Sequence, residues 1–144
     1  MMTVGGTQPD AIPIPVVAAA IRDEAGWVLA CRRAPGRDSS GLWEFPGGKI
    51  ESGEEPEAAI ARELDEELGI VVTIQGVVDR SVTSTGRAVI DLTCFQAVLI
   101  GEKPTTSSDH DDLHWLPAAR LPELNWCKPD LPAVTKLVEA DVLR

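Results

Sequence analysis

The sequence predicts a single domain of the α/β class, and three observations support this prediction. The chain has 144 residues, which is the commonest size for one domain with its own hydrophobic core. Its composition, 44% hydrophobic and 25% charged, is that of an ordinary globular protein. Short β-branched apolar runs lie on both sides of one strongly amphipathic segment in mid-chain. We therefore expect strands and helices that share one core.

The N-terminal segment is expected to precede the folded domain. Residues 1–11 are rich in Gly, Thr and Pro without periodicity, and the Pro residues of 12–15 exclude a helix interior there. We place a flexible lead-in at residues 1–14 and the domain at residues 15–144. The lead-in has neither the basic start nor the long apolar stretch of a secretory signal, so a cytoplasmic location is expected.

Most of the domain reads as strands joined by polar turns. The strands are expected at residues 16–21, 27–31, 71–74, 77–78, 88–100 and 113–116. The turns and loops between them are expected at residues 22–26, 32–41, 83–87 and 104–112. A C-terminal helix is expected at residues 131–143, because Leu131, Val134, Leu137 and Val138 have helical spacing.

Residues 55–68 predict a helix whose two ends are specified locally. Pro56 suits the first helical position, and Gly69 suits a left-handed cap at the C-terminus. A buried stripe is expected at Ile60, Leu64 and Leu68. A different face of the helix gathers Glu63, Glu66 and Glu67.

Clustered glutamates on one helix face have two interpretations. Like charges at these spacings cost roughly 0.2–0.5 kcal/mol per pair, and a solvated face relieved by Arg62 is the simpler interpretation. A metal site is the other, because Gly47-Gly48 lies just ahead in the chain and glycine lets bare backbone approach an ion. Carbonyl and carboxylate oxygens are the ligands that Mg²⁺ prefers.

The net charge of −10 limits the possible partners. DNA and RNA are disfavoured, since polyanion binding needs a basic surface, and no apolar run reaches the roughly 18 residues of a membrane span. A small polyphosphate is compatible if divalent cations lie between it and the carboxylates. The odd number and wide spacing of Cys31, Cys94 and Cys127 predict reduced, buried thiols.

The segment GKIESGEEPEAAIARELDEELGI, residues 48–70, resembles the Nudix box of the MutT family. The matching positions are Gly48, Glu54, Arg62, Glu63, Leu64, Glu66, Glu67, Gly69 and Ile70. The preceding WEFPGG extends the likeness. The resemblance implies a Nudix fold, an α/β/α sandwich with a mixed sheet in which the box forms a loop, helix, loop unit. It also implies hydrolysis of a nucleoside triphosphate to a monophosphate and pyrophosphate with Mg²⁺, for which Mn²⁺ can substitute.

The resemblance further implies roles for individual residues. The implied metal ligands are the Gly48 carbonyl and the side chains of Glu54, Glu63, Glu66 and Glu67. Asp109 is the nearest counterpart of a further acidic ligand from a later loop, although a solvated acidic loop explains it equally well. Arg62 is expected to orient the carboxylates. Glu66, or alternatively Glu67, is expected to accept a proton from the attacking water.

Substrate choice is expected to depend on residues outside the box. The chain has no Tyr, and no Pro lies between Pro56 and Pro104, which disfavours resemblance to the diadenosine polyphosphate and ADP-ribose enzymes. The MutT and CTP pyrophosphohydrolase branch remains. Asp130 falls where readers of 8-oxoguanine carry Asn, and an ionised Asp suits the amino group of cytosine, with Lys128 as a donor to the base. Alternatively, Asp130 caps the final helix.

Further substrate contacts are expected from an aromatic side chain and from arginines. Phe45 or Trp43 can stack on the base, although core packing explains either residue equally well. Arg32 and Arg87 are the preferred phosphate or base contacts, with Arg33 as a third candidate. The expected substrates are dCTP, CTP and their 5-methyl forms in nucleotide-pool sanitation, and the alternative is 8-oxo-dGTP. A non-catalytic nucleotide-binding module is the alternative of another class, and either a monomer or a homodimer is compatible with the sequence.

Overall fold

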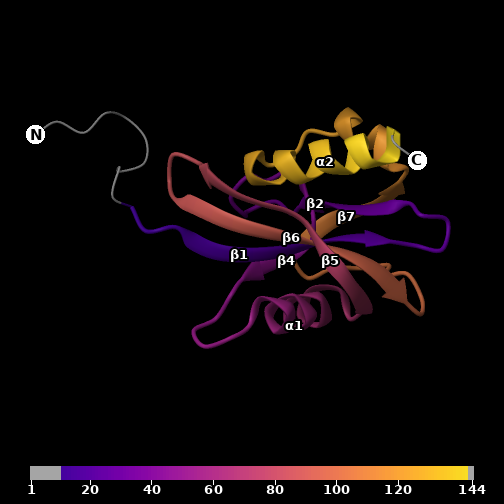
Figure 1. Cartoon of the computed structure of the whole chain (residues 1–144), viewed down its shortest axis with the longest axis horizontal. Coiled ribbons are helices and arrows are strands. Elements are labelled where there is room, and N and C mark those ends of the chain that lie inside the picture. Colours follow the sequence, from indigo (N-terminus) through magenta and orange to yellow (C-terminus); the bar gives the residue numbers. More distant parts are fainter. Residues whose placement is uncertain (1–10, 143–144) are drawn as a thin grey trace, which may run out of the picture.

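The structure, a computed structural model, describes residues 11–142 and contains a mixed β-sheet between two helices (Figure 1). The strands are β1 (Ile14–Arg22), β2 (Val28–Arg33), β3 (Trp43–Glu44), β4 (Gly47–Lys49), β5 (Val71–Ser84), β6 (Val89–Ile100) and β7 (His110–Leu116). The helices are α1 (Pro56–Leu68) and α2 (Leu131–Val142), with 3-10 turns η1 (Ala118–Glu123) and η2 (Lys128–Asp130). The expected α/β class and mixed sheet are confirmed.

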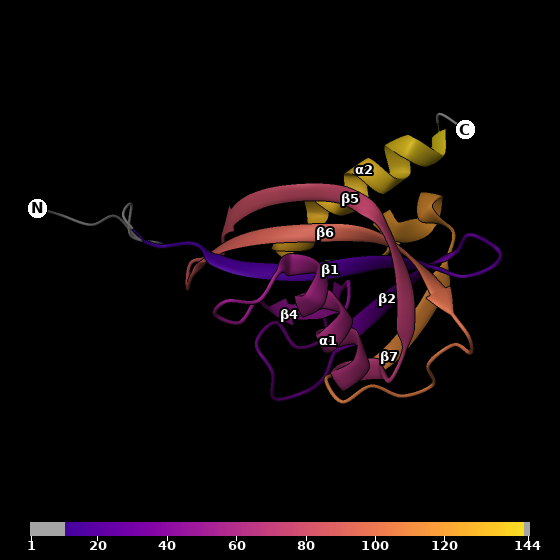
Figure 2. The same ribbon diagram turned by 60° about the horizontal axis from the view of Figure 1, so that its bottom comes forward.

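The strand order is β3-β2-β1-β6-β5, with β4 also paired to β1 and β7 to β2. Strands β1 and β6 run parallel, and the other pairs are antiparallel. Figure 2 shows the sheet from the α1 side, with α2 on the opposite side of the sheet. Because both faces are covered, β1 can be apolar at successive positions, as its uninterrupted apolar run requires.

Each face of the sheet has its own hydrophobic core. Val17, Ala19 and Ile21 of β1 pack with α1, whereas Ala18 and Ala20 pack with α2 on the other side. The helical stripe predicted from the sequence is confirmed, because Ile60, Leu64 and Leu68 are all buried. The three cysteines are free and buried, as expected.

The local end signals of α1 also act as predicted. Pro56 opens the helix, and Gly69 adopts a φ of 65° while its N–H donates to the Asp65 carbonyl at 3.0 Å. Local sequence signals therefore set where α1 begins and ends, and the tertiary structure sets which face of α1 is buried.

Some strand boundaries differ from the sequence prediction. Strand β5 continues to Ser84 through two register shifts between Ile74 and Asp79, because it pairs along the whole of β6. Gly47 and Gly48, for which no strand was predicted, belong to the short strand β4, because this segment pairs with β1. Strand β7 begins at His110, within the stretch expected to be flexible.

Most of the expected lead-in, residues 1–10, lies outside the described part of the chain, and β1 begins at Ile14. Within residues 11–142, no helix is both long and apolar enough to cross a membrane.

Candidate active site

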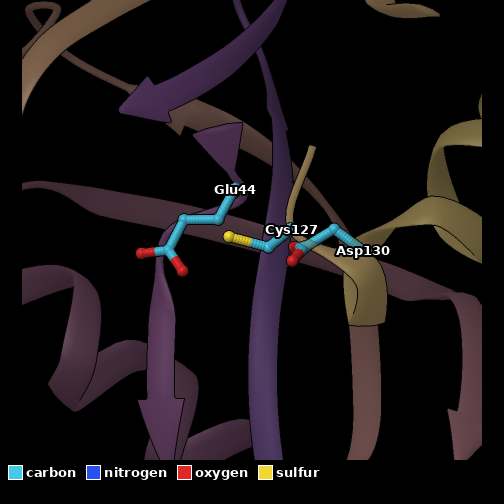
Figure 3. A group of neighbouring side chains, drawn as sticks. All are labelled: Glu44, Cys127 and Asp130. Carbon is cyan, nitrogen blue, oxygen red and sulfur yellow. The ribbon is translucent and has the colours of Figure 1, made fainter. Parts of the chain in front are cut away.

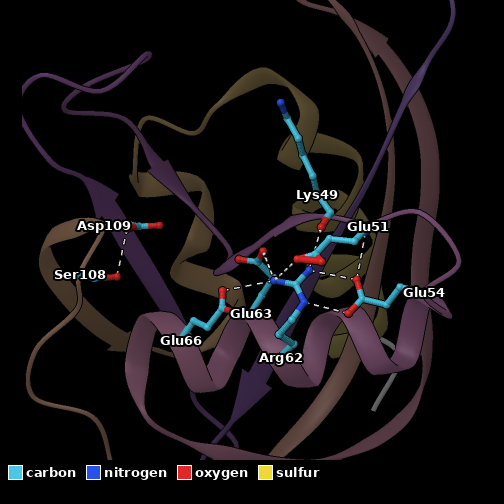
Figure 4. A network of polar contacts seen from close by, with 8 residues as sticks. All are labelled: Lys49, Glu51, Glu54, Arg62, Glu63, Glu66, Ser108 and Asp109. Atoms are coloured by element: carbon cyan, nitrogen blue, oxygen red, sulfur yellow. Dashed lines mark hydrogen bonds and ion pairs between the residues drawn. The ribbon is translucent and has the colours of Figure 1, made fainter.

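Arg62 organises the polar face of α1 (Figure 4). Its Nε and Nη2 donate to the two Glu54 carboxylate oxygens at 2.8 and 3.0 Å, a bidentate pair that lowers the pKa of Glu54 to about 2. Its Nη1 donates to Glu63 at 3.0 Å and to Glu66 at 3.2 Å. Nη2 also reaches the Lys49 carbonyl at 3.1 Å. One guanidinium therefore relieves the expected repulsion and joins the helix to the preceding loop and β4.

Gly48 leaves room for the Glu63 carboxylate beside bare backbone. A Cβ at Gly48 would lie 2.5 Å from Glu63 Oε2 and 2.6 Å from Oε1, well inside van der Waals contact. Gly47 has a different reason for being glycine, since its Cβ would lie 2.7 Å from the Ala18 Cα and closer still to the Val17 carbonyl oxygen. Gly47 thus permits the pairing of β4 with β1, and Gly48 permits the carboxylate.

Glu67 is buried, although it belongs to the glutamate face. Only 6% of it is exposed, and its Oε2 has no hydrogen-bond partner among residues 11–142. Burial raises the pKa of Glu67 to about 10, with smaller contributions from Glu63, Asp109 and Glu44. A buried carboxyl oxygen without a partner is costly unless a ligand satisfies it.

These side chains fit a divalent cation. The Glu63 carboxylate lies against the Gly48 backbone, and the Glu67 carboxyl lies close enough to Glu63 to be affected by it. Arg62 holds the Glu66 carboxylate on the same side of α1 as that of Glu63. Such an oxygen-rich donor set matches Mg²⁺. A cation there would satisfy Glu67 Oε2 and favour the ionised form of that carboxyl.

Asp109 lies close to this cluster, in the loop before β7. Its Oδ1 accepts hydrogen bonds from Arg37 at 2.8 Å and from the Ser108 hydroxyl at 3.0 Å. The Ser108 N–H donates to the Glu67 carbonyl at 3.1 Å, which ties the loop to the end of α1. The charge of Asp109 reaches Glu67 strongly enough to help raise its pKa. Its role as a metal ligand stays a prediction.

A cavity of about 570 Å³ brings two of the predicted metal ligands together with residues expected to bind the substrate, whereas the predicted glutamate ligands do not line it. Gly48 and Asp109 line it together with Phe45, Arg87 and Asp130. These five positions come from distant parts of the sequence and were predicted as site residues.

Two predicted substrate contacts, Arg32 and Lys128, do not line the cavity. Arg32 pairs with Asp111 at 2.7 Å and lies over the Trp43 ring, 5.8 Å from its centroid. Lys128 Nζ donates to the Ser84 carbonyl at 3.1 Å. Their substrate contacts stay predictions.

The less favoured Arg33 does line the cavity, together with Glu44 and Cys127, which were not proposed as site residues. Arg33 donates to Glu44 Oε1 at 3.0 Å. Glu44 lies beside Phe45 in the WEFPGG segment, and this position was the sequence signal that could have identified Glu44 as a site residue. No local pattern joins it to Cys127, because the two are brought together only by the fold.

The aromatic candidates pack in the core. Phe45 is 2% exposed, and its ring centroid lies 4.7 Å from that of Trp126, although it also lines the cavity. Trp43 packs against His114 at 4.9 Å and does not line the cavity. The core-packing alternative therefore describes Trp43, and Phe45 serves the core while facing the cavity.

Asp130 is buried, although the sequence prediction treated it as an ionised residue. It is 6% exposed, and its Oδ1 accepts the Phe45 N–H at 3.1 Å instead of capping α2. Burial raises the pKa of Asp130 well above its usual value, and the nearby charge of Glu44 adds to this. A charged carboxylate loses hydration at such a buried position, so burial disfavours the ionised form that the base-recognition prediction assumed. The role of Asp130 in base recognition stays a prediction.

Comparisons with known proteins agree with this geometry. The chain matches the NUDIX domain family over residues 13–137. It is 38% identical over 106 residues to a Mycobacterium tuberculosis protein provisionally named 8-oxo-dGTP diphosphatase 2, covering 72% of this chain and 73% of that protein. It is 33% identical over 127 residues to the CTP pyrophosphohydrolase of Escherichia coli, covering 88% and 84%.

The fold is shared with solved structures. The crystal structure of the MutT protein from Methanosarcina mazei Go1 has a TM-score of 0.81 at 20% identity, covering 93% of this chain and 99% of that chain. The chain belongs to the Nudix family. It is a hydrolase of phosphoric anhydride bonds, of a family that acts on small nucleotides with divalent metal ions.

Proposed function

We propose that the chain is a Mg²⁺-dependent nucleoside triphosphate pyrophosphohydrolase that releases a nucleoside monophosphate and pyrophosphate. The buried Glu67 oxygen without a hydrogen-bond partner carries this proposal, since Glu67 lies close to Glu63, and the Glu63 carboxylate lies against Gly48, whose backbone lines a cavity of about 570 Å³. Gly48, Glu54, Glu63, Glu66, Glu67 and Asp109 are the proposed metal-site residues. Mn²⁺ is expected to replace Mg²⁺, because it accepts the same oxygen ligands.

A bound divalent ion would lower the pKa of water and screen the phosphate charge. The chain's own residues do the remaining work. Arg62 holds Glu54, Glu63 and Glu66 in fixed positions, so less conformational entropy is lost when these carboxylates are arranged for the reaction. Glu66 is the proposed proton acceptor, because its side chain is 59% exposed to solvent and Arg62 holds only its Oε2 atom. Glu67 is the alternative acceptor.

We propose cytosine nucleotides, dCTP and CTP with their 5-methyl forms, as substrates. A neutral Asp130 has one O–H donor and retains acceptor capacity. This pattern complements the N4 amino group and the N3 acceptor of cytosine. The resemblance of the whole domain to a CTP pyrophosphohydrolase supports the same choice. Arg87 is the proposed cationic contact in the cavity, with Phe45 beside the base.

The neutral Asp130 also favours a second candidate, 8-oxo-dGTP. Its donor and acceptor complement the O6 acceptor and N7–H donor of 8-oxoguanine, as an Asn amide does. The similarity to the protein provisionally named 8-oxo-dGTP diphosphatase 2 supports this candidate as well. The charge state of Asp130 therefore does not show whether cytosine or 8-oxoguanine is the preferred base.

A nucleotide panel tests the substrate. Specificity constants measured with dCTP, CTP, 5-methyl-dCTP, dGTP and 8-oxo-dGTP are expected to be highest for a cytosine nucleotide. A highest value for 8-oxo-dGTP would replace the first candidate with the second. Pyrophosphate release that is absent with Mg²⁺ for every nucleotide, despite nucleotide binding, would support the non-catalytic module instead.

Two isosteric variants test the catalytic residues. Glu66→Gln and Glu67→Gln keep side-chain volume and remove charge, so each is expected to fold and to lose turnover by about a hundredfold or more. Near-normal turnover of both variants at saturating Mg²⁺ would refute the assignment. Circular dichroism and melting temperature check that each variant is folded.

A further inference from the structure

A cluster of three ligand-type side chains lies in the cavity, apart from the α1 glutamates. One ligand atom each from Glu44, Cys127 and Asp130 lies within 4.8 Å of the other two (Figure 3). The Cys127 Sγ points toward Glu44 in this view, and all three residues line the 570 Å³ cavity. Neither the sequence motif nor the proposed metal chemistry uses this group.

Cys127 supplies a second observation that points to a ligand. It is 7% exposed, and its thiol makes no hydrogen bond with another residue in the described part of the chain. The Asp130 carboxyl uses only Oδ1, for the Phe45 N–H. The cluster therefore directs toward the same small volume a buried thiol that has no hydrogen bond to another described residue, together with a carboxyl group.

The charges around the cluster suit a doubly charged ion. With Cys127, Glu44 and Asp130 ionised and Arg33 bound to Glu44, one divalent cation makes the group neutral. Without such an ion, burial raises the pKa of Cys127 to about 12 and that of Asp130 well above its usual value. Cation binding would then displace protons from these groups, as at other thiolate sites.

We propose that Glu44, Cys127 and Asp130 form a second cation site, which takes a borderline-soft divalent ion of the Zn²⁺ class and blocks the cavity when occupied. Sulfur disfavours Mg²⁺ and favours Zn²⁺. A tetrahedral Zn²⁺ with these ligands needs ligand atoms roughly 3.4–3.7 Å apart, so atoms that lie within 4.8 Å of one another need to close by about 1 Å at most. The fourth position is left to water.

His110 and Arg33 position the Glu44 carboxylate in this site. His110 Nε2 lies 2.8 Å from Glu44 Oε2, and its Nδ1 lies 2.7 Å from the Ser107 hydroxyl. The Arg33 guanidinium holds the other oxygen at 3.0 Å. Outer partners of this kind orient metal ligands, so Glu44 is already held near the thiol before any ion binds.

The site is tested with Cd²⁺ alone, whose bond to a thiolate absorbs in the ultraviolet. Titration of the wild-type protein is expected to give a charge-transfer band that saturates at one equivalent. Cys127→Ser is expected to abolish the band, and the matched control Cys94→Ala, which removes a thiol buried elsewhere, is expected to keep it. Asp130→Asn is expected to keep the band with affinity at least about tenfold weaker.

No band in the wild-type protein, or a full band in Cys127→Ser, would overturn the proposal. Melting curves and circular dichroism of each variant identify a loss of fold. The titration needs no nucleotide and no turnover, so its result is independent of the proposed function.

The blocking effect is tested by turnover and rests on the proposed function. With Mg²⁺ saturating, Zn²⁺ is expected to inhibit the wild-type protein at a concentration at least about tenfold below that needed for Cys127→Ser, each rate being normalised to its own uninhibited value. Equal inhibition of both proteins would place the Zn²⁺ effect at the α1 glutamates and overturn the blocking claim. Absence of turnover with a normal Cd²⁺ band would instead refute the proposed function alone.

Discussion

The adjacent glycines of β4 allow fold and activity to be perturbed separately, by Gly47→Ala and Gly48→Ala. Neither glycine has a positive φ, so the backbone of both positions accepts alanine and only steric contact matters. At Gly47 the new methyl group meets the backbone of Val17 and Ala18. At Gly48 it meets the movable end of the Glu63 side chain.

The expected magnitudes follow from what has to move. Relieving the Gly47→Ala contact requires a shift of more than 1 Å between β4 and β1, which is an overpacking cost of about 3 kcal/mol and a decrease in Tm of about 10 °C. For Gly48→Ala the Glu63 carboxylate can rotate away, so a cost of about 1 kcal/mol or less is expected. Displacing that carboxylate by about 1 Å is expected to lower kcat by about a hundredfold.

The assays are thermal unfolding without metal and steady-state turnover with saturating Mg²⁺. Gly47→Ala is expected to unfold at a clearly lower temperature, whereas Gly48→Ala is expected to keep its Tm within a few degrees and lose its activity. A Gly48→Ala protein with normal kcat would refute the argument that Glu63 must lie against bare backbone. A Gly48→Ala protein as unstable as Gly47→Ala would show that the carboxylate cannot move.

Two further predictions concern pH and metal. Because the pKa of Asp130 is raised above its usual value of 3.8, its contribution to stability is complete below that value and is lost as the pH rises toward its folded pKa. The free energy of unfolding should therefore fall by up to about 1.4 kcal/mol per pH unit in this range. Urea unfolding measured across this pH range should show a flatter dependence of the unfolding free energy on pH for Asp130→Asn than for the wild type. Identical pH dependences would contradict the assignment of Asp130 as a buried acid. At a concentration about a hundredfold above its Kd, Mg²⁺ should stabilise the protein by about 2.7 kcal/mol, and EDTA should reverse this effect. Glu67→Gln should reduce the stabilisation by Mg²⁺, because the Oε2 atom of Glu67 then no longer needs a cation. An equal Mg²⁺-induced rise in Tm for wild type and Glu67→Gln would exclude Glu67 as a ligand.

The helix α1 shows how much could be predicted from local sequence. Pro56, Gly69 and the Ile60, Leu64, Leu68 stripe specify its ends and its buried face, and the structure confirms each of them. These signals are local, because capping and helical periodicity act within one or two turns. The strand β5 was predicted less well, since its length depends on pairing with β6 across two register shifts.

The burial of Asp130 shows what local sequence could not supply. An aspartate near a predicted helix start is ordinarily solvated, whereas η2 carries Asp130 into the interior beside Glu44, where burial raises its pKa. Glu67 is likewise buried, although the adjacent Glu66 side chain is 59% exposed. Desolvation depends on everything packed around a group, and sequence neighbours are only a small part of that.

By itself, the sequence determined the class of the fold, the helix that presents the glutamates and the identity of the proposed metal ligands. It could do so because helix ends, periodicity and the box motif are encoded within a short stretch. Only the tertiary structure decided that Phe45, Arg87, Asp109 and Asp130 share one cavity, that Arg32 and Lys128 lie outside its lining, and that Cys127 meets Glu44. These outcomes depend on contacts between distant segments, which are set by packing on the two faces of the sheet.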